Sequence, residues 1–151
     1  MTSSKNDPSQ SLSHQCVLDA SALLALLHHE PGGESVRPHL PDAVISSVNW
    51  AEVVQKCVAR NVRVEGLRSD LESLGMQVLP FNADDAEVSG RLWSDTKALG
   101  LSLGDRACLA LGQRLHLPVL TADRVWGSLP VDFPVQIIRW KKPAAWRPNK
   151  D

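Results

Sequence analysis

Hydrophobic residues along this chain fall into short apolar runs that alternate with longer segments of helical spacing. In segment 48–60, Trp50, Val53, Val54 and Cys57 recur at the spacing of one helix face. The apolar runs are short and are bounded by Gly, Pro or Asp, which is typical of strands. The pattern predicts strands over 15–19, 42–47, 76–80, 117–123 and 135–140, helices over 21–29, 48–60, 64–74, 83–99 and 105–116, and a short helical turn near 34–39.

Strands separated by helices of this length indicate parallel β-α-β crossovers. We therefore predict an α/β fold, a three-layer α/β/α sandwich with a parallel sheet. The chain has 151 residues, 43% of them hydrophobic, which suffices for one sizeable core but not for two domains. The polar, Ser-rich segment 1–14 predicts a disordered leader, 15–140 the folded domain, and 141–151 a basic and aromatic C-terminal tail.

Composition and charge exclude several classes of protein. The formal net charge of −1, from 16 basic and 17 acidic side chains, gives no overall positive field, although a local basic patch stays possible. The three cysteines are far apart and form no C-x-x-C pair, so neither a disulfide framework nor a zinc ribbon is indicated. The polar start is unlike a signal peptide, and no apolar run approaches the ~20 residues of a membrane helix. We predict a cytoplasmic protein.

Four acidic residues are placed where the predicted sheet would bring them to one edge. Asp19 ends the first predicted strand and Asp123 ends the strand 117–123, while Glu52 and Asp105 lie near the starts of helices that follow the same edge. In open parallel sheets, ligands bind outside the carboxyl ends of the strands. Carboxylates gathered there repel one another unless a cation or a proton offsets their charge.

Each acid taken singly also fits a helix cap. Glu52 comes three residues after Asn49, and Asp105 comes three residues after Ser102, which is the spacing of a capping box. Asp19 and Asp123 are each followed closely by a helical segment or turn, so each is a possible N-cap. The capping alternative stays open at this level, but it does not predict that all four acids share one edge.

Four stretches, "VLDASALLALLHHEPG", "ISSVNWAEVV", "LSLGDRACLALG" and "VLTADRVW", resemble successive motifs of PIN-domain ribonucleases, particularly the VapC-type toxins of bacterial toxin-antitoxin modules. The resemblance covers about 16–138. By position, it implies an acidic metal-binding quartet and two auxiliary hydroxyls, namely Asp19, Glu52, Asp105 and Asp123 with Ser21 and Thr121. It further implies an endoribonuclease toxin that forms a homodimer and is held inactive by a cognate VapB-type antitoxin. An apolar groove for the antitoxin is expected near 34–39 and the helices that follow.

The chemistry of these side chains is consistent with that resemblance. Clustered oxygen ligands without nearby His or Cys favour a hard divalent ion, Mg²⁺ or Mn²⁺, over zinc. Such an ion can activate water for in-line attack on an RNA phosphodiester. We expect Asp19 and Asp105 to be direct ligands, Glu52 a ligand or a base acting through water, and Asp123 a ligand that acts through water. Ser21 and Thr121 would orient water or phosphate.

Two other classes of protein stay open. One is a non-enzymatic α/β interaction module whose acids are only caps. The other is a phosphoryl-accepting domain of the receiver or haloacid-hydrolase kind that uses Asp19, although Ser21 stands where a haloacid-type phosphatase has its second acid. The cysteines are predicted to fill the core. The remaining acids of turns and helix faces are predicted to be solvated surface, namely Glu30, Glu34, Asp42, Asp84, Asp85 and Asp95.

Overall fold

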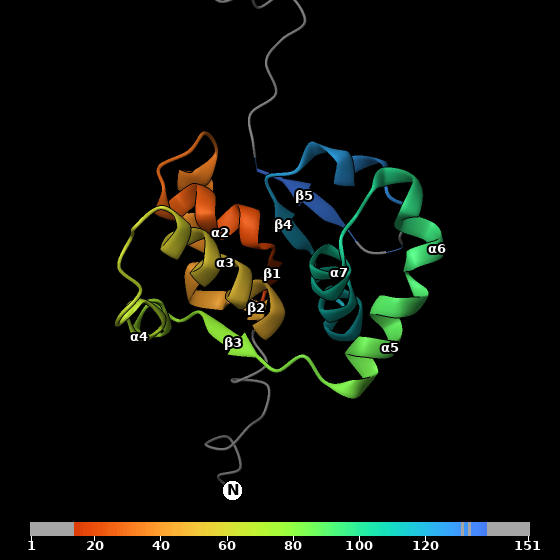
Figure 1. Ribbon diagram of the computed structural model, residues 1–151, viewed down its shortest axis with the longest axis horizontal. Helices are drawn as coiled ribbons and strands as arrows, with labels where there is room; N and C mark the ends of the chain where they lie inside the picture. The colour runs from red at the N-terminus through yellow and green to blue at the C-terminus, as the bar shows by residue number, and fades with distance from the viewer. Residues whose placement is uncertain (1–13, 131, 133, 139–151) are drawn as a thin grey trace, which may run out of the picture.

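A five-stranded parallel sheet forms the centre of the molecule (Figure 1). The structure is a computed structural model that describes residues 14–130, 132 and 134–138. The strands are β1 (Cys16–Leu18), β2 (Ala43–Ser46), β3 (Gln77–Leu79), β4 (Val119–Thr121) and β5 (Val135–Ile137), in the order β3-β2-β1-β4-β5. The strand order reverses between β1 and β4. The chain first adds β2 and β3 on one side of β1, and it then adds β4 and β5 on the other side. This reversal point is where such sheets place their ligand sites.

Helices cover both faces of the sheet, as Figure 1 shows. One layer contains α2 (Ala20–Leu27), the 3-10 helix η2 (Gly33–Asp42), α3 (Ser47–Ala59) and α4 (Leu67–Ser73). The other contains α5 (Ala83–Arg91), α6 (Trp93–Thr96), η3 (Lys97–Leu99) and α7 (Leu103–Leu115), and the 3-10 helix η4 (Arg124–Ser128) follows β4. The predicted three-layer α/β/α sandwich is confirmed.

Alternation along the strands separates two hydrophobic cores. Cys16 and Leu18 of β1 belong to the core under α2 and α3, whereas Val17 between them belongs to the core under α7. This is the two-residue period of a strand that is buried on both faces. Cys57 and Cys108 also lie in these cores as free thiols, which confirms the prediction that the cysteines are core residues.

Two predicted helices differ from the structure. The prediction of one helix over 83–99 is wrong, because the segment divides at Leu92 into α5 and α6 and then continues as η3. Thr96 Oγ1 donates to the Leu92 carbonyl oxygen at 2.9 Å, and Gly90 lowers helix propensity just before the break. The helix predicted over 64–74 begins only at Leu67, because Gly66 adopts a left-handed backbone conformation with φ 81°.

Other element boundaries shift by smaller amounts. The helix predicted over 105–116 begins two residues earlier, at Leu103, and the turn predicted near 34–39 is the longer η2. The predicted leader, except for His14, the predicted tail and the last two residues of the strand predicted over 135–140 lie outside the described residues. Within the described part of the chain, no helix is long and apolar enough to cross a membrane.

Candidate active site

Asp19 follows β1 directly and lies at the reversal point of the sheet. It is 4% exposed, and its backbone N–H donates to the Leu120 carbonyl oxygen at 2.9 Å, which joins the end of β1 to β4. Ser21 Oγ and Thr121 Oγ1 donate hydrogen bonds to Asp19 Oδ2 at 2.6 and 2.9 Å. Asp19 occupies the N-cap position of α2, but its side chain accepts no hydrogen bond from a helix amide. The alternative that its carboxylate caps α2 is therefore wrong.

The charge on Asp19 is unfavourable in this position. Burial raises the pKa of Asp19 to about 6, although its two hydroxyl donors lower it, and the charges on Asp105 and Glu52 raise it further. Burial also raises the pKa of the Cys108 thiol well above its usual range, and the charges on the same three carboxylates add to that rise. Glu52 and Asp105 therefore lie close enough to Asp19 for their charges to repel that of its carboxylate.

Glu52 is not the acidic member of a capping box. The N-cap residue of α3 is Ser46, whose Oγ accepts a hydrogen bond from the Val48 N–H at 3.2 Å. This places Glu52 in the second turn of α3 and Asn49 inside the helix. The capping box that the sequence suggested for this pair is wrong, so capping does not account for the charge on Glu52.

Asn49 and Gly104 hold the Glu52 side chain between α3 and α7. Asn49 is fully buried, and its Nδ2 donates to Glu52 Oε1 at 2.8 Å and to the Gly104 carbonyl oxygen at 2.9 Å. Asn49 Oδ1 has no hydrogen-bond partner among the described residues. A Cβ atom at position 104 would lie 2.5 Å from Glu52 Oε2, so the carboxylate fills space that only glycine leaves open.

Asp105 has a capping role and also belongs to the acidic cluster. Its backbone N–H donates to Ser102 Oγ at 3.1 Å, and the Ser102 N–H donates to Asp105 Oδ2 at 2.9 Å, which is a complete capping box at the start of α7. The capping alternative is confirmed for this residue. The bond occupies one carboxylate oxygen, and the charge of the group still acts on Asp19.

Asp123 lies farther from the cluster. It is exposed, and its Oδ1 accepts a hydrogen bond from the Val125 N–H at 3.0 Å, which caps η4 as the capping alternative predicts. Its charge is not among the causes that shift the pKa of Asp19. Its backbone N–H donates to Thr121 Oγ1 at 3.1 Å, so it adjoins the site through a residue that contacts Asp19. The structure thus brings three of the four predicted acids together.

Ser21 and Thr121 form a polar bridge beneath Asp19. Their hydroxyl oxygens lie 3.2 Å apart, and Ser21 Oγ accepts a hydrogen bond from the Ala122 N–H at 2.9 Å. Both hydroxyls bond to the Asp19 carboxylate, so they hold it in place against the repulsion of its neighbours. Their predicted contact with water or phosphate stays a prediction.

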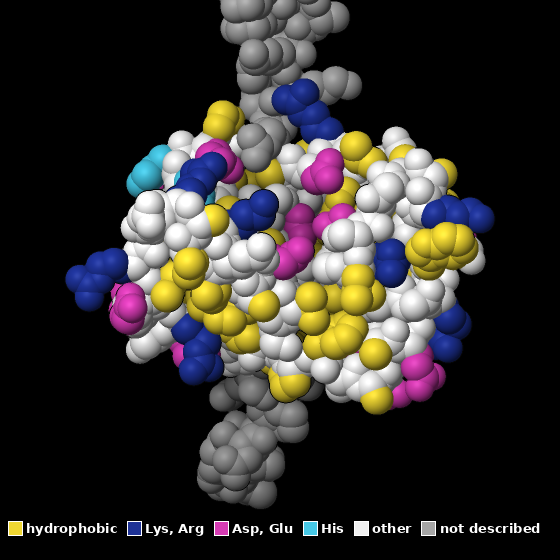
Figure 2. All heavy atoms as spheres, in the orientation of Figure 1, with side chains coloured by type: hydrophobic (Ala, Val, Ile, Leu, Met, Phe, Trp, Pro, Cys, Tyr) yellow, Lys and Arg dark blue, Asp and Glu magenta, His cyan; other side chains and the backbone are white. Residues whose placement is uncertain are grey.

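The donor set matches a hard cation in its chemistry. Figure 2 shows Asp and Glu side chains gathered near the centre of one face, and the three clustered carboxylates supply oxygen ligands of the kind that Mg²⁺ and Mn²⁺ prefer. In the described residues, no three His, Cys, Asp or Glu side chains lie close enough together to hold a metal ion. Direct coordination of one ion by all three carboxylates would therefore require them to lie closer together than they do here.

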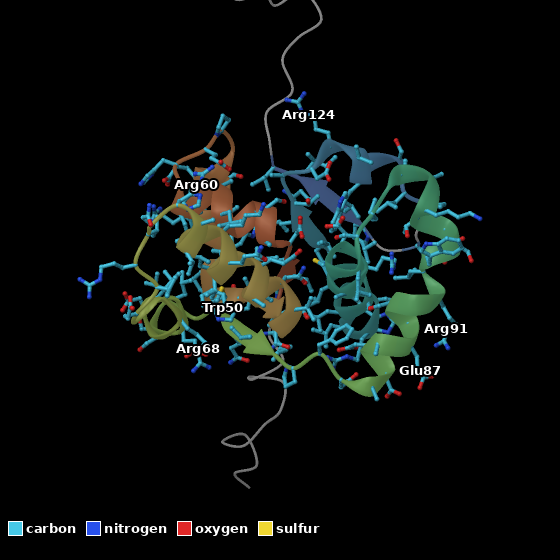
Figure 3. All side chains as sticks on the ribbon, viewed as in Figure 1. Trp50, Arg60, Arg68, Glu87, Arg91 and Arg124 are labelled. Carbon is cyan, nitrogen blue, oxygen red and sulfur yellow. The ribbon has the colours of Figure 1, made fainter. Side chains whose placement is uncertain are left out.

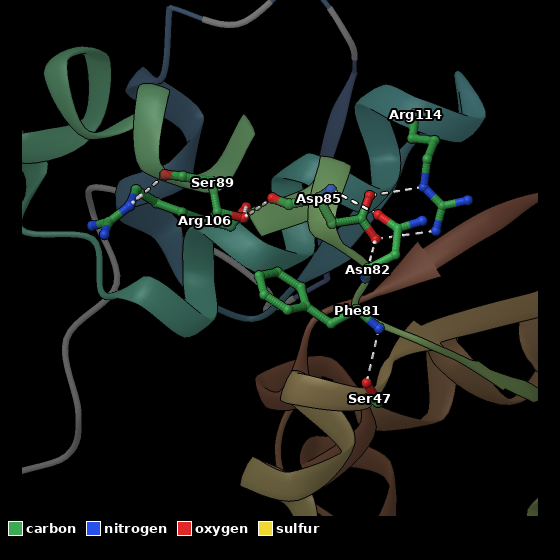
Figure 4. Close-up of polar contacts among 7 residues, drawn as sticks. All are labelled: Ser47, Phe81, Asn82, Asp85, Ser89, Arg106 and Arg114. Carbon is green, nitrogen blue, oxygen red and sulfur yellow. Dashed lines mark hydrogen bonds and ion pairs between the residues drawn. The ribbon is translucent and has the colours of Figure 1, made fainter. Parts of the chain in front are cut away.

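Asp85 corrects one sequence prediction. It was expected on the solvated surface, but it is 2% exposed and pairs with Arg114, with Nε to Oδ1 at 2.8 Å and Nη2 to Oδ2 at 3.1 Å (Figure 4). It also forms a capping box with Asn82 at the start of α5. The spacing of Asn82 and Asp85 could have revealed the cap, but no local signal points to an arginine 29 residues away.

Arg106 extends this polar network to the start of α7. Its Nε donates to the Ser89 carbonyl oxygen at 2.9 Å, and Ser89 Oγ donates to the Asp85 carbonyl oxygen at 2.7 Å (Figure 4). Arg106 Nη1 also donates to the Leu101 carbonyl oxygen at 3.2 Å. These bonds fix α5 against the first turn of α7, next to Asp105. This network was not predicted from the sequence, and neither were the contacts of Asn49 and Gly104 with Glu52.

Comparison with known proteins identifies the family. The PIN domain family model matches residues 16–130, which is most of the chain. The chain therefore belongs to the PIN domain family, as its motifs predicted. No curated protein sequence matches it.

Solved structures share the fold at low sequence identity. A toxin-antitoxin complex from Klebsiella pneumoniae has a TM-score of 0.61 and 22% identity, covering 82% of this chain and 100% of that chain. FitAcB from Neisseria gonorrhoeae has a TM-score of 0.62 and 21% identity, covering 81% and 96%. DNA-bound VapBC from Salmonella typhimurium has a TM-score of 0.59 and 15% identity, covering 82% and 98%. At these identities the likeness shows the fold alone.

Proposed function

We propose that this protein is a divalent-metal-dependent endoribonuclease. The observation that carries the proposal is the buried carboxylate of Asp19, which faces the charges of Glu52 and Asp105 at the reversal point of the sheet. Helix capping accounts for Asp105 and Asp123 but leaves Asp19 and Glu52 unexplained. Membership in the PIN domain family supports the proposal and replaces the receiver and haloacid-hydrolase alternatives.

The residues of the site would divide the work of phosphodiester hydrolysis. Asp19 and Asp105 would hold Mg²⁺ or Mn²⁺, and Asp123 would contribute through water. An ion of this kind lowers the pKa of a bound water and offsets negative charge on the phosphodiester. Glu52 accepts the proton of the attacking water, because Asn49 fixes its Oε1 while its Oε2 has no hydrogen-bond partner among the described residues. The water oxygen would bond to phosphorus, the bond from phosphorus to the leaving oxygen would break, and the leaving oxygen would take a proton from solvent to become a hydroxyl.

Cleavage with and without chelator tests this function. Purified protein free of any partner is expected to cleave single-stranded or looped RNA in Mg²⁺ or Mn²⁺ and to stop in EDTA. Equal cleavage in EDTA would exclude the metal mechanism. Absence of cleavage with either ion, across a pool of structured and unstructured RNAs, would favour the non-enzymatic interaction module.

Replacing Gly104 with Ala is expected to lower the cleavage rate about tenfold, because the new Cβ displaces the Glu52 carboxylate and misplacement of about 1 Å is costly in an active site. The matched control is Gly90→Ala in α5, where a Cβ meets no atom within 4 Å. That control should raise stability by about 0.5 to 1 kcal/mol and leave the rate unchanged. Rates and melting curves measured for both variants make the comparison, and an unchanged rate in Gly104→Ala would remove Glu52 from the mechanism.

The partner follows from the resemblance and the related structures. We propose that the nuclease is the toxin of a toxin-antitoxin pair, that it forms a homodimer, and that a VapB-type antitoxin segment docks on α3 and α4. A hollow of about 340 Å³ lies between these helices, and Figure 3 shows Trp50 on α3. It is lined by Trp50, Val54, Val64, Gly66, Arg68 and Ser69. Growth arrest on expression of the chain alone, relieved by Asp105→Asn, tests the toxin role, and harmless expression of active protein would contradict it.

A further inference from the structure

An acidic centre that cleaves RNA must bind a substrate that carries the same sign of charge. The phosphates of RNA are negative, the clustered carboxylates repel them, and the chain carries a formal net charge of −1. Affinity for a nucleic-acid backbone comes mainly from cationic side chains that neutralise phosphates. If RNA is the substrate, local cations beside the acidic centre must hold it, because no broad positive field does.

A pocket of about 190 Å³ adjoins the acidic centre between α2 and α3. Ser21 lines the pocket and also donates a hydrogen bond to Asp19 Oδ2, so this residue belongs to both the pocket and the acidic centre. Glu52 and Lys56 on α3 and Arg60 at its C-cap follow one another at four-residue spacing, which places them along one side of the helix. The pocket is lined by Ser21, Leu24, His28, Glu30, Lys56 and Arg60.

The pocket has an excess of positive charge. Arg60 Nη1 lies 3.0 Å from His28 Nδ1, and because a guanidinium only donates, the imidazole nitrogen is the acceptor of this hydrogen bond. Arg60 Nη2 lies 3.6 Å from Glu30 Oε2, a loose pair. Lys56 has no ion pair or hydrogen bond with any described side chain. Two cations thus face one carboxylate, and Figure 2 shows Lys and Arg side chains on the α2–α3 side of the central acids.

We propose that this pocket binds a backbone phosphate of the RNA beside the bond that is cleaved, an inference that rests on the proposed function. Lys56 supplies an ammonium that has no partner among the described residues, and Arg60 supplies a guanidinium that His28 and Glu30 hold in place. The pocket holds the volume of several water molecules, which a phosphate group can displace. The arrangement anchors the strand on α3 while the next phosphate along the backbone lies at the acidic centre.

A distant arginine is the matched control. Arg60 and Arg91 have side chains that are 57 and 72% exposed, and they lie 3.6 and 3.9 Å from a glutamate oxygen. Arg91 on α5 lies away from the pocket (Figure 3). Both side chains are exposed, so replacement with Gln should leave the fold intact.

Binding of a fluorescein-labelled single-stranded RNA 12-mer tests the pocket. Anisotropy titrations in Mg²⁺ use protein that carries Asp105→Asn to prevent turnover, at several salt concentrations. Lys56→Gln and Arg60→Gln are each expected to weaken binding about three- to tenfold and to reduce the slope of log Kd against log salt by about 0.7, the value for one phosphate of a single strand. Arg91→Gln should change neither quantity.

The outcomes separate the pocket from the nuclease function. Selective loss of binding in the pocket variants supports the phosphate site whether or not the unmodified protein cleaves RNA. Cleavage of RNA by the unmodified protein, together with equal salt slopes in pocket and control variants, would overturn the phosphate site and leave the nuclease function standing. Pocket variants that bind RNA normally but bind a poly-glutamate peptide less tightly would overturn it in favour of an acidic protein segment.

Discussion

Asp19→Asn is expected to lower the rate of RNA cleavage at least about a hundredfold at saturating Mn²⁺, which corresponds to about 2.7 kcal/mol of transition-state stabilisation. The substitution removes a charged ligand and keeps an oxygen that can accept the hydrogen bonds from Ser21 and Thr121. Asp105→Asn should have a similar effect. Its amide oxygen can still accept from the Ser102 N–H, so the cap of α7 is retained while the charge is lost.

A surface acid provides the comparison for these two variants. Asp84 is exposed in the first turn of α5, and Asp84→Asn should leave the cleavage rate unchanged. Initial rates on one RNA substrate, with melting curves to confirm that each variant is folded, make the measurement. Rates near that of the unmodified protein in both Asp19→Asn and Asp105→Asn would show that the acidic cluster is not the active site.

The second large effect is a loss of stability as pH rises in the absence of metal. The folded-state pKa of Asp19 is about 6, above the ordinary value of 3.8, so between these values the folded state binds more protons than the unfolded state. The contribution of Asp19 to the free energy of unfolding therefore falls as pH rises from about 4 to 6. Above pH 6 the ionised carboxylate destabilises the folded state by about 2 to 3 kcal/mol. Below pH 4 the carboxyl is protonated in both states and the cost disappears.

Chemical denaturation of metal-free protein between pH 4 and 8 measures this dependence. The difference in unfolding free energy between Asp19→Asn and the unmodified protein isolates the contribution of Asp19 from that of other acids. It should grow from near zero at pH 4 to its full value above pH 6, with the variant the more stable. A variant less stable than the unmodified protein at pH 7.5 would mean that the Asp19 charge stabilises the fold.

The sequence predicted the layers of the fold because the physical signals for them are local. Alternating short apolar runs and amphipathic segments determine a parallel sheet with helices on both faces. The position of Asp19 at the carboxyl end of β1 follows from that sheet alone. The break at Leu92 was missed because only Gly90 marks it and a side-chain bond from Thr96 completes it. The start of α4 at Leu67 was likewise missed, because it depends on the left-handed backbone of Gly66, and many glycines do not adopt that conformation.

The candidate site was predictable only in part, since its support comes from distant contacts. The three-residue spacing correctly predicted a capping box between Ser102 and Asp105. The same spacing wrongly predicted a capping box between Asn49 and Glu52, because α3 begins before Asn49. The role of Asn49 depends on Gly104, which lies 55 residues away in the sequence. Such contacts exist only once α3 and α7 are packed together.

A Mn²⁺ titration of thermal stability at pH 7.5 and fixed ionic strength tests most directly whether the acidic cluster holds a divalent cation. At ten times its dissociation constant, an ion that binds only the folded state adds about 1.4 kcal/mol, or roughly 3 to 6 °C in melting temperature. We expect this increase in the unmodified protein and in Asp84→Asn. Most of the increase should be lost in Asp19→Asn and in Asp105→Asn. No Mn²⁺-dependent increase in the unmodified protein, or an equal increase in all three variants, would contradict a metal site held by Asp19 and Asp105.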